Sequence, residues 1–216
     1  MNFLTNPAEI EKKSFEIISQ KLQGREVDSQ NLNVIKRVIH TTADFDYAEN
    51  LIFSPGALKV AQDALISGAR LVTDTQMAKA GINKTAAATL GCDIHCFIDA
   101  PEVAALAQAN GYTRARAAID KAAKTLQNPL IFVVGNAPTA LIRLYELITE
   151  QAFSPTLIIA VPVGFVNVVE SKELILELKV PHIVAKGQKG GSNVAAAICN
   201  ALLYQVIKTV NNGGAI

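Results

Sequence analysis

The sequence predicts one α/β domain built on a mostly parallel sheet of five or more strands, with helices covering both faces. Five short runs rich in β-branched and aromatic residues alternate along the chain with segments whose apolar residues have helical spacing. Several of these runs have no polar face, which is typical of parallel strands buried on both sides. The predicted strands are 71–73, 94–98, 130–134, 156–163 and 182–185.

Length and continuity favour a single domain. The chain has 216 residues, which suits one core better than two. No linker, internal repeat or low-complexity tract interrupts the alternation of strands and helices. We therefore expect residues 1–210 to form one domain and residues 211–216, which are rich in asparagine and glycine, to be a flexible tail.

Three helices are predicted ahead of the first of these strands. The first begins after Pro7 and ends before Gly24, and the second follows Ser29. The third begins at Ser54-Pro55, with serine in the N-cap position and proline in the first helical position, and ends at Gly68.

The remaining predicted helices fill the gaps between strands, as right-handed crossovers in a parallel sheet require. They are a short helix to Gly81, one from Thr85 to Gly91, one opening at Pro101, one capped by Thr113, one opening at Pro138, one from Ser171 to Leu178, and a long apolar helix from Ser192 to about Ile207.

Composition restricts the partners and the compartment. Lysine and arginine (20) nearly balance aspartate and glutamate (19), so we expect neither nucleic acid nor an anionic membrane surface as a partner. Three cysteines make an odd, sparse set, which favours a reducing compartment, and we expect a cytoplasmic protein. No signal-peptide pattern and no run of about 18 apolar residues is present, so no membrane span is expected. The expected partner is a small molecule or another protein chain.

Three glycine-containing loops follow predicted strands, at the edge where open parallel sheets bind ligands. They are 135–139, 163–165 and 187–192. The first opens a helix, so its backbone N–H groups are expected to favour an anion, and glycines let a ligand approach the backbone. Glycines that only make tight turns explain any single loop equally well. A nucleotide site is disfavoured, because neither dinucleotide-binding nor P-loop spacing occurs.

Two histidines, His40 and His95, are candidates for a catalytic or metal-binding role. Arg37 and His40 lie three residues apart on the second helix and can serve one site. From spacing alone, a structural histidine is the commoner case. Cys92-x-x-His95-Cys96 gathers metal-ligand types, but adjacent strand residues point to opposite faces and no fourth ligand is close in sequence. We expect no metal site there.

Blocks of sequence along nearly the whole chain resemble the precorrin-8X / cobalt-precorrin-8 methylmutase family. The Gly-Asn-Ala-Pro-Thr-Ala and Pro-Val-Gly-Phe-Val blocks together are highly specific to that family. The matching blocks are 9–18, 37–40, 53–55, 73–77, 134–141, 162–166, 170–172 and 190–192.

The resemblance implies a reaction and its catalytic residue. The family moves a methyl group from C11 to C12 of a tetrapyrrole in corrin biosynthesis, without a redox cofactor. The family's histidine matches His40 and shares or transfers a proton at a ring nitrogen, a role that suits imidazole near neutral pH. Family members form homodimers, so a homodimer is expected.

The resemblance also implies residues that bind the carboxylates of the substrate. Ser14 and Arg37 match substrate-contacting positions, and Arg114 matches a further basic position. The remaining expected substrate-binding residues lie in the strand-end loops: Thr73, Asn136, Ala137, Gly164, Gly190, Gly191 and Ser192.

One departure from the family pattern affects the glycine-rich loop. Relatives commonly carry arginine where this chain has Gln188, and Lys189 is expected to compensate as a point charge. Residues 41–45 look more like the anaerobic, cobalt-early branch, so cobalt-precorrin-8 is the favoured substrate and cobalt would arrive with it. A tetrapyrrole carrier, which needs no proton donor, is the alternative.

Overall fold

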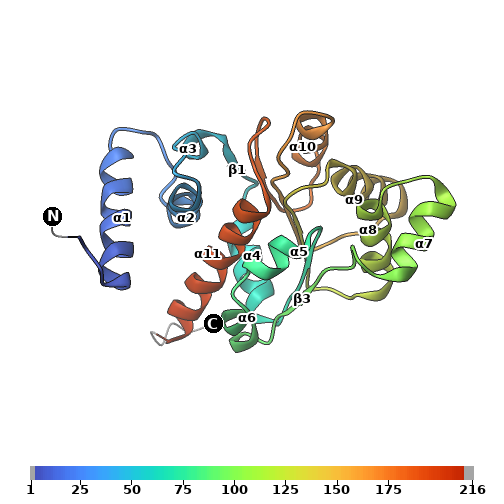
Figure 1. Ribbon diagram of the computed structural model, residues 1–216, viewed down its shortest axis with the longest axis horizontal. Helices are drawn as coiled ribbons and strands as arrows, with labels where there is room; N and C mark the ends of the chain where they lie inside the picture. The colour runs from blue at the N-terminus through green and yellow to red at the C-terminus, as the bar shows by residue number, and fades with distance from the viewer. Residues whose placement is uncertain (1–2, 212–216) are drawn as a thin grey trace.

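Six strands form one sheet in the order β1-β6-β5-β4-β2-β3, as the computed structural model shows for residues 3–211 (Figure 1). All neighbouring pairs are parallel except β1 with β6. The mostly parallel α/β architecture is therefore confirmed. The strands are β1 (Leu51–Phe53), β2 (Arg70–Thr73), β3 (Asp93–His95), β4 (Leu130–Val134), β5 (Leu157–Ala160) and β6 (His182–Ala185).

All five predicted strands are present, although β3 ends at His95 rather than at residue 98 and β5 ends at Ala160 rather than at residue 163. Strand β1 is an addition. It has three residues, Leu51–Phe53, and Leu51 pairs with Ala185 in antiparallel register at the edge of the sheet. Three residues are too few to show strand periodicity. Tertiary pairing with β6, not local sequence, makes this segment a strand.

The central strands are buried on both faces, and alternate residues enter two different cores. In β4, all five residues are buried. Ile131 and Val133 belong to one core, whereas Leu130, Phe132 and Val134 belong to the other. This period of two is what the pleat of a strand dictates, and it explains why these strands lack a polar face.

Helices cover both faces (Figure 1). The first core is closed by α1 (Pro7–Lys21), α2 (Leu32–Thr42), α3 (Tyr47–Asn50), α4 (Ala57–Ile66), α5 (Gln76–Gly81), α6 (Lys84–Thr89) and α11 (Ser192–Asn211). The second is closed by α8 (Arg114–Thr125), α9 (Pro138–Gln151) and α10 (Val168–Leu176), with α7 (Pro101–Asn110) packed on α8.

The observed starts of α8 and α4 can be compared with the predicted N-cap residues. Thr113 caps α8 as predicted, with its hydroxyl accepting from the N–H of Arg116. The predicted start at Ser54-Pro55 is wrong, because α4 begins at Ala57 after Gly56, whose φ is +74°. The Ser54 hydroxyl instead accepts from the N–H of His182 at 2.9 Å. Ser54 therefore ties its turn to β6 rather than capping a helix.

The long helix α11 is the central element of the first core. By length and composition it could cross a membrane, but 56% of its apolar window is buried inside the fold, as is common for core helices. It packs against α2, α4 and α5. Ala195 on α11 and Ala115 on α8 are both buried within the chain, so these alanines serve packing within one subunit.

The chain's end differs slightly from the prediction. α11 continues to Asn211, so the ordered helix extends one residue past the predicted boundary at residue 210. The rest of the predicted flexible tail, residues 212–216, lies outside the described residues.

Strand order reverses between β2 and β4. The chain moves outward from β2 to β3, and then crosses back to place β4, β5 and β6 on the other side of β2. In open α/β sheets the crevice at such a reversal, beyond the carboxyl ends of the strands, is the usual ligand site. The loops after β2 and β4 therefore meet where a site is expected.

Candidate active site

Helix α2 places His40 at the surface in its last turn. The helix buries Val34, Ile35, Val38 and Ile39 in the core, which leaves the His40 side exposed. α2 ends at Ala43, whose φ is +56°. A histidine in the last helical turn can interact favourably with the helix dipole when it carries a proton.

The Phe15 ring contacts both residues that sequence singled out on α2. Its ring is stacked on the imidazole of His40, with centroids 5.1 Å apart and planes 14° apart. The guanidinium carbon of Arg37 lies 4.8 Å from the centroid of the same Phe15 ring, within cation–π range. Helix α1, which carries Phe15, thereby fixes the orientation of His40.

Ser14 and His40 line one open cavity between α1 and α2, with a volume of about 330 Å³. The Ser14 hydroxyl donates to the carbonyl of Ile10 at 2.8 Å, so its oxygen remains able to accept from a ligand. Apolar residues and one lysine complete the lining: Ile17, Ile18, Lys21, Ile39, Ala43 and Phe45. The structure thus brings together two of the predicted site residues.

Arg37 faces a different hollow. It lines a cavity of about 280 Å³ with Thr41, Asn193 and Tyr204, between α2 and α11. One of its terminal nitrogens donates to Glu11 Oε1 at 2.7 Å. Arg37 and His40 therefore share the Phe15 ring but line separate cavities, one on each side of α2.

The backbone N–H groups of the loop after β4 bind a carboxylate of the protein itself, that of Asp74. The carboxylate of Asp74, at the end of β2, accepts from the backbone N–H groups of Gly135, Asn136 and Ala137 at 2.7–2.9 Å. Asp74 is 3% exposed. Burial raises the pKa of the Asp74 carboxyl above its usual range, and the three N–H bonds oppose that rise.

Asp74 changes the expectation that this loop binds a substrate carboxylate through its backbone. All three N–H groups donate to Asp74 and are therefore not free to bind a ligand anion. Asn136 is the one of these three whose side chain is exposed. Its amide is the group this loop still offers to a ligand.

Thr73 and Ser192 make internal contacts. The Thr73 hydroxyl is 3.1 Å from the carbonyl of Thr75 and 3.2 Å from that of His95, and Thr73 is 2% exposed. The Ser192 hydroxyl lies 2.7 Å from that of Thr75, and Ser192 is 8% exposed. Both hydroxyls form hydrogen bonds that link the loops at the strand ends. The sequence did not predict this structural role.

Glycines in the same loops have two different structural reasons. A Cβ on Gly190 would lie 2.1 Å from the carbonyl oxygen of Val161, so close packing of two backbone segments requires glycine there. Gly191 and Gly164 have φ of +134° and +144°, a backbone conformation that favours glycine. Backbone packing and positive φ, not only the approach of a ligand, therefore explain these glycines.

The lysine expected to replace a missing arginine is already paired. Lys189 Nζ lies 2.6 Å from Asp44 Oδ2 and 2.6 Å from Asp46 Oδ2, just beyond α2. The hydrogen bond from Lys189 lowers the pKa of the Asp44 carboxyl. Lys189 is thus no free point charge for a substrate, and it links the glycine-rich loop to the end of the helix that carries His40.

Arg114 lies far from His40. It is exposed at the start of α8, beside the β4 loop, where the hydroxyls of Thr113 and Thr139 lie 2.7 Å apart. Helices α8 and α2 cover opposite faces of the sheet and lie on opposite sides of it along the long axis of the molecule (Figure 1). Within one chain, Arg114 and His40 do not share a cavity.

The Cys92–Cys96 segment does not form a metal cluster. Cys92 Sγ is 3.3 Å from the carbonyl of Leu65, and the ring of His95 stacks on Phe97. Burial lowers the pKa of His95. Within residues 3–211, no group of three His, Cys, Asp or Glu side chains is placed to hold a metal ion.

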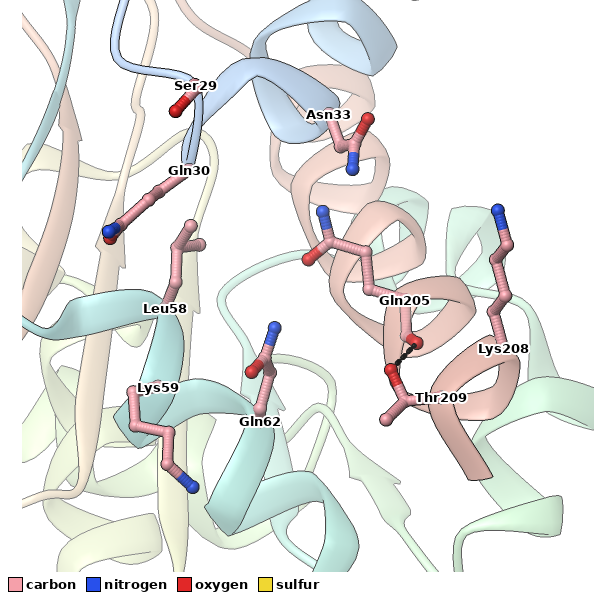
Figure 2. A pocket seen from close by; sticks show the side chains of 9 residues that line it. All are labelled: Ser29, Gln30, Asn33, Leu58, Lys59, Gln62, Gln205, Lys208 and Thr209. Atoms are coloured by element: carbon pink, nitrogen blue, oxygen red, sulfur yellow. Dashed lines mark hydrogen bonds between the residues drawn. The ribbon is translucent and has the colours of Figure 1, made fainter. Parts of the chain in front are cut away.

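A larger cavity than that of His40, about 480 Å³, lies elsewhere, between the start of α2, α4 and the end of α11 (Figure 2). Amide side chains ring it, and Figure 2 shows Asn33 and Gln205 facing across its upper part. Lys59 at its rim is paired with Asp63. This cavity contains none of the residues that sequence predicted for the site.

Cavity size bears on the ligand. Sites that enclose drug-sized ligands span roughly 300–1,000 Å³, and a tetrapyrrole with acidic side chains is larger than most such ligands. The His40 cavity, at about 330 Å³, is therefore too small to enclose a molecule of that size.

Sequence reasoning missed the residues that hold the site together. Phe15 was not predicted as a site residue, although an aromatic residue on the partly exposed side of a predicted helix is a usable signal. Asp74 and Lys172 lie in two of the matching blocks, 73–77 and 170–172, but no role was predicted for them, because burial of a charge depends on the tertiary fold.

Fold and site together define a single-domain α/β enzyme whose functional groups come from a surface helix pair and from loops at the carboxyl ends of parallel strands. The chain belongs to the precorrin-8X methylmutase family, since residues 9–205 match the family model CbiC, precorrin-8X methylmutase. The family name denotes a methylmutase, an isomerase.

Individual relatives agree with this assignment. The chain is 45% identical to the cobalt-precorrin-8 methylmutase of Salmonella typhimurium over 95% of this chain and 99% of the relative. It is 35% identical to the precorrin-8X methylmutase of Pseudomonas aeruginosa, over 94% and 97%. The crystal structure of the Thermus thermophilus precorrin-8X methylmutase superposes with a TM-score of 0.84 at 37% identity, covering 95% of this chain and 99% of that one.

Proposed function

We propose that this protein moves a methyl group from C11 to C12 of precorrin-8X or cobalt-precorrin-8, giving hydrogenobyrinate or cobyrinate. The observation that carries the proposal is the combination of a family match over residues 9–205 with the placement of His40. The imidazole of His40 is exposed, held by Phe15, and lines a cavity with Ser14.

His40 is the proposed proton carrier. The imidazole can hold or release a proton near neutral pH, and a proton shared with a ring nitrogen lowers the barrier to rearrangement of the macrocycle. Stacking on Phe15, at 5.1 Å between centroids, supports a fixed ring orientation. A fixed orientation favours proton sharing at one defined atom of the substrate.

Substrate carboxylates are proposed to bind along the surface around α2. Arg37 retains N–H donors beyond the one that Glu11 occupies, and the Asn136 amide is exposed in the loop after β4. Arg114, on the opposite face of the sheet from α2, is not proposed to contact a substrate held at His40 of the same chain. Gly164, Gly190 and Gly191 allow the backbone conformations and the close packing of the loops after β5 and β6. Thr73 and Ser192 support these loops from inside, and Ala137 supports them through its N–H bond to Asp74.

The cobalt form is the favoured substrate. The relatives in Salmonella, at 45% identity, and in Leptospira interrogans, at 41%, carry the name cobalt-precorrin-8 methylmutase. The metal would enter as part of the substrate, and the protein needs no cofactor of its own for a methyl shift within one molecule.

Homodimer formation and a cytoplasmic location complete the proposal. The outer side of α1 leaves Ile10 and Ile17 more than 40% exposed next to the His40 cavity, and a second copy is the proposed cover. Light scattering during size-exclusion chromatography is expected to give twice the chain mass of 23.0 kDa, and a mass of one chain at micromolar concentration would refute it. The three cysteines are free thiols, as suits a reducing compartment.

The test of function is conversion of substrate. Purified protein is incubated with precorrin-8X and, separately, with its cobalt complex, and the absorption spectrum is followed. We expect conversion, faster with the cobalt form. A tetrapyrrole carrier, the alternative, would shift the spectrum on binding without producing the methyl isomer.

Replacement of His40 tests its role. We expect His40→Ala to lower kcat by about 10²- to 10⁴-fold, because a positioned acid–base group contributes about that much, while product binding is retained. Lys36→Ala, on the same helix, serves as the control. Normal turnover by the His40 variant would remove it from the mechanism.

A further inference from the structure

Lys172 on α10 is a buried charge that the proposed reaction does not use. It is 1% exposed, and no carboxylate among the described residues pairs with it. Burying an unpaired ammonium is costly. Such a group in a natural sequence calls for a structural or functional reason.

The contacts of Lys172 indicate what that reason is. Its Nζ donates to the carbonyl of Gly187 at 2.7 Å and to that of Lys189 at 2.8 Å. These two carbonyls belong to the glycine-rich loop between β6 and α11. Burial lowers the pKa of Lys172 to about 8, so the ammonium form still predominates at neutral pH and can make strong, charge-assisted bonds to both carbonyls.

Two further contacts extend this anchor toward His40. The loop carries Lys189, whose Nζ lies 2.6 Å from a carboxylate oxygen of both Asp44 and Asp46. The N–H of Asp44 in turn bonds to the hydroxyl of Thr42, the last residue of α2. A chain of contacts thus runs from the buried ammonium through the loop to the helix end that carries His40.

We propose that Lys172 is a positioning residue, which fixes the glycine-rich loop so that Lys189 can hold the end of α2 and, with it, the imidazole of His40. The role of this loop in turnover rests on the proposed function. The mechanical link itself does not, and can be measured without substrate.

The first experiment uses hydrogen exchange of the full-length chain at pH 7. Reporters are the N–H of Gly191, bonded to Val161, the N–H of Gly164, bonded to Gln188, and the segment 41–47. Lys172→Met removes both donors at similar volume and is expected to speed exchange at all three. Lys189→Met is expected to speed exchange at 41–47 alone.

Lys186→Met is the matched control, because Lys186 is exposed at the start of the same loop and makes none of these contacts. It is expected to change no reporter. Unchanged exchange at 41–47 in Lys172→Met would overturn the proposal. If that variant does not fold, Lys172→Arg, which keeps a donor, and Lys189→Met provide the same comparison.

The second experiment is a double-mutant cycle on turnover. Two residues in one chain of contacts are coupled, so their effects do not add. We expect Lys172→Met and Lys189→Met each to lower kcat about tenfold, and the double variant to fall no more than about twofold further. A product of the two effects, about 100-fold, would mean that the residues act independently and would overturn the link. A wild-type protein that converts neither substrate would refute the proposed function, and the exchange result would still decide the role of Lys172.

Discussion

Two buried charges organise the loops at the carboxyl ends of the strands. Asp74 collects three backbone N–H groups of the β4 loop, and Lys172 collects two carbonyls of the loop after β6. Each charge satisfies backbone groups that a buried loop would otherwise leave without partners. Within residues 3–211 neither has an ion-pair partner of opposite sign, so each depends on the backbone geometry around it.

Asp74→Asn is predicted to destabilise the protein. An amide presents a donor where the carboxylate presents only acceptors, so at least one buried N–H loses its partner. We expect the free energy of unfolding at pH 7 to fall by about 2 kcal/mol, measured by urea denaturation. Asp63→Asn, on the exposed side of α4, is the control, with an expected change below about 0.5 kcal/mol. Equal effects would show that the three bonds contribute little.

Lys172 gives a pH-dependence whose sign is fixed. Its pKa is lowered from 10.5 to about 8 in the folded state, so between these values the unfolded chain binds more protons than the folded chain. The free energy of unfolding of the wild type, relative to Lys172→Met, should therefore rise by up to about 3 kcal/mol from pH 8 to pH 10.5. Denaturation curves of both proteins across that range measure it. A constant difference would contradict the burial of an ionised lysine.

At the scale of elements, the glycine-rich loop and the end of β5 pack backbone against backbone. Gly191 N–H bonds to the carbonyl of Val161 at 2.8 Å, and Gly190 lies on the same strand end. The loop is therefore held against the carboxyl end of β5 and is not a free lid. A shape fixed in this way presents the same surface to every substrate molecule.

Gly190→Ala is predicted to push this loop off β5. Its Cβ would lie 2.1 Å from the Val161 oxygen, so backbone atoms must move. We expect the free energy of unfolding, measured by thermal denaturation, to fall by about 2 kcal/mol or more. Gly187→Asn is the control, because nothing lies within 4 Å of a Cβ there and asparagine tolerates its φ of +75°. A Gly190 variant as stable as the wild type would show that the loop adapts freely.

Elements with a strong local signal were predicted, and elements made by contacts were not. Buried strands such as β4 are recognisable from a run of apolar residues. The Thr113 cap is recognisable from a side chain whose oxygen can accept from the first backbone N–H groups of a helix. Strand β1 and the start of α4 depend on β6, through the Leu51–Ala185 pair and the Ser54 hydroxyl. Long-range partners of this kind leave no trace in the local sequence.

At the scale of the whole molecule, one phenylalanine lies in the core and another on the surface. Phe132 is fully buried between the sheet and α8–α10, whereas Phe165 is 84% exposed in the loop after β5. We expect Phe132→Ala to lower the free energy of unfolding by about 3–5 kcal/mol, and Phe165→Ala to change it by less than about 0.5 kcal/mol. Chemical denaturation of both variants checks this. A large loss from Phe165→Ala would place that loop in a core.

The sequence by itself determined the α/β architecture, the order of its elements, and the family, because burial periodicity and short contiguous motifs are local properties of a chain. It also indicated His40, whose position within a motif and at the end of a helix needs no distant partner.

Only the tertiary structure decided how the site is assembled. It separated Arg37 from His40 into different cavities, placed Phe15 against both, and filled the expected anion site with Asp74. It also committed Lys189 to the end of α2. These outcomes depend on which segments meet across the fold, and two residues 145 positions apart, such as Asp44 and Lys189, become neighbours only when the sheet brings their loops together.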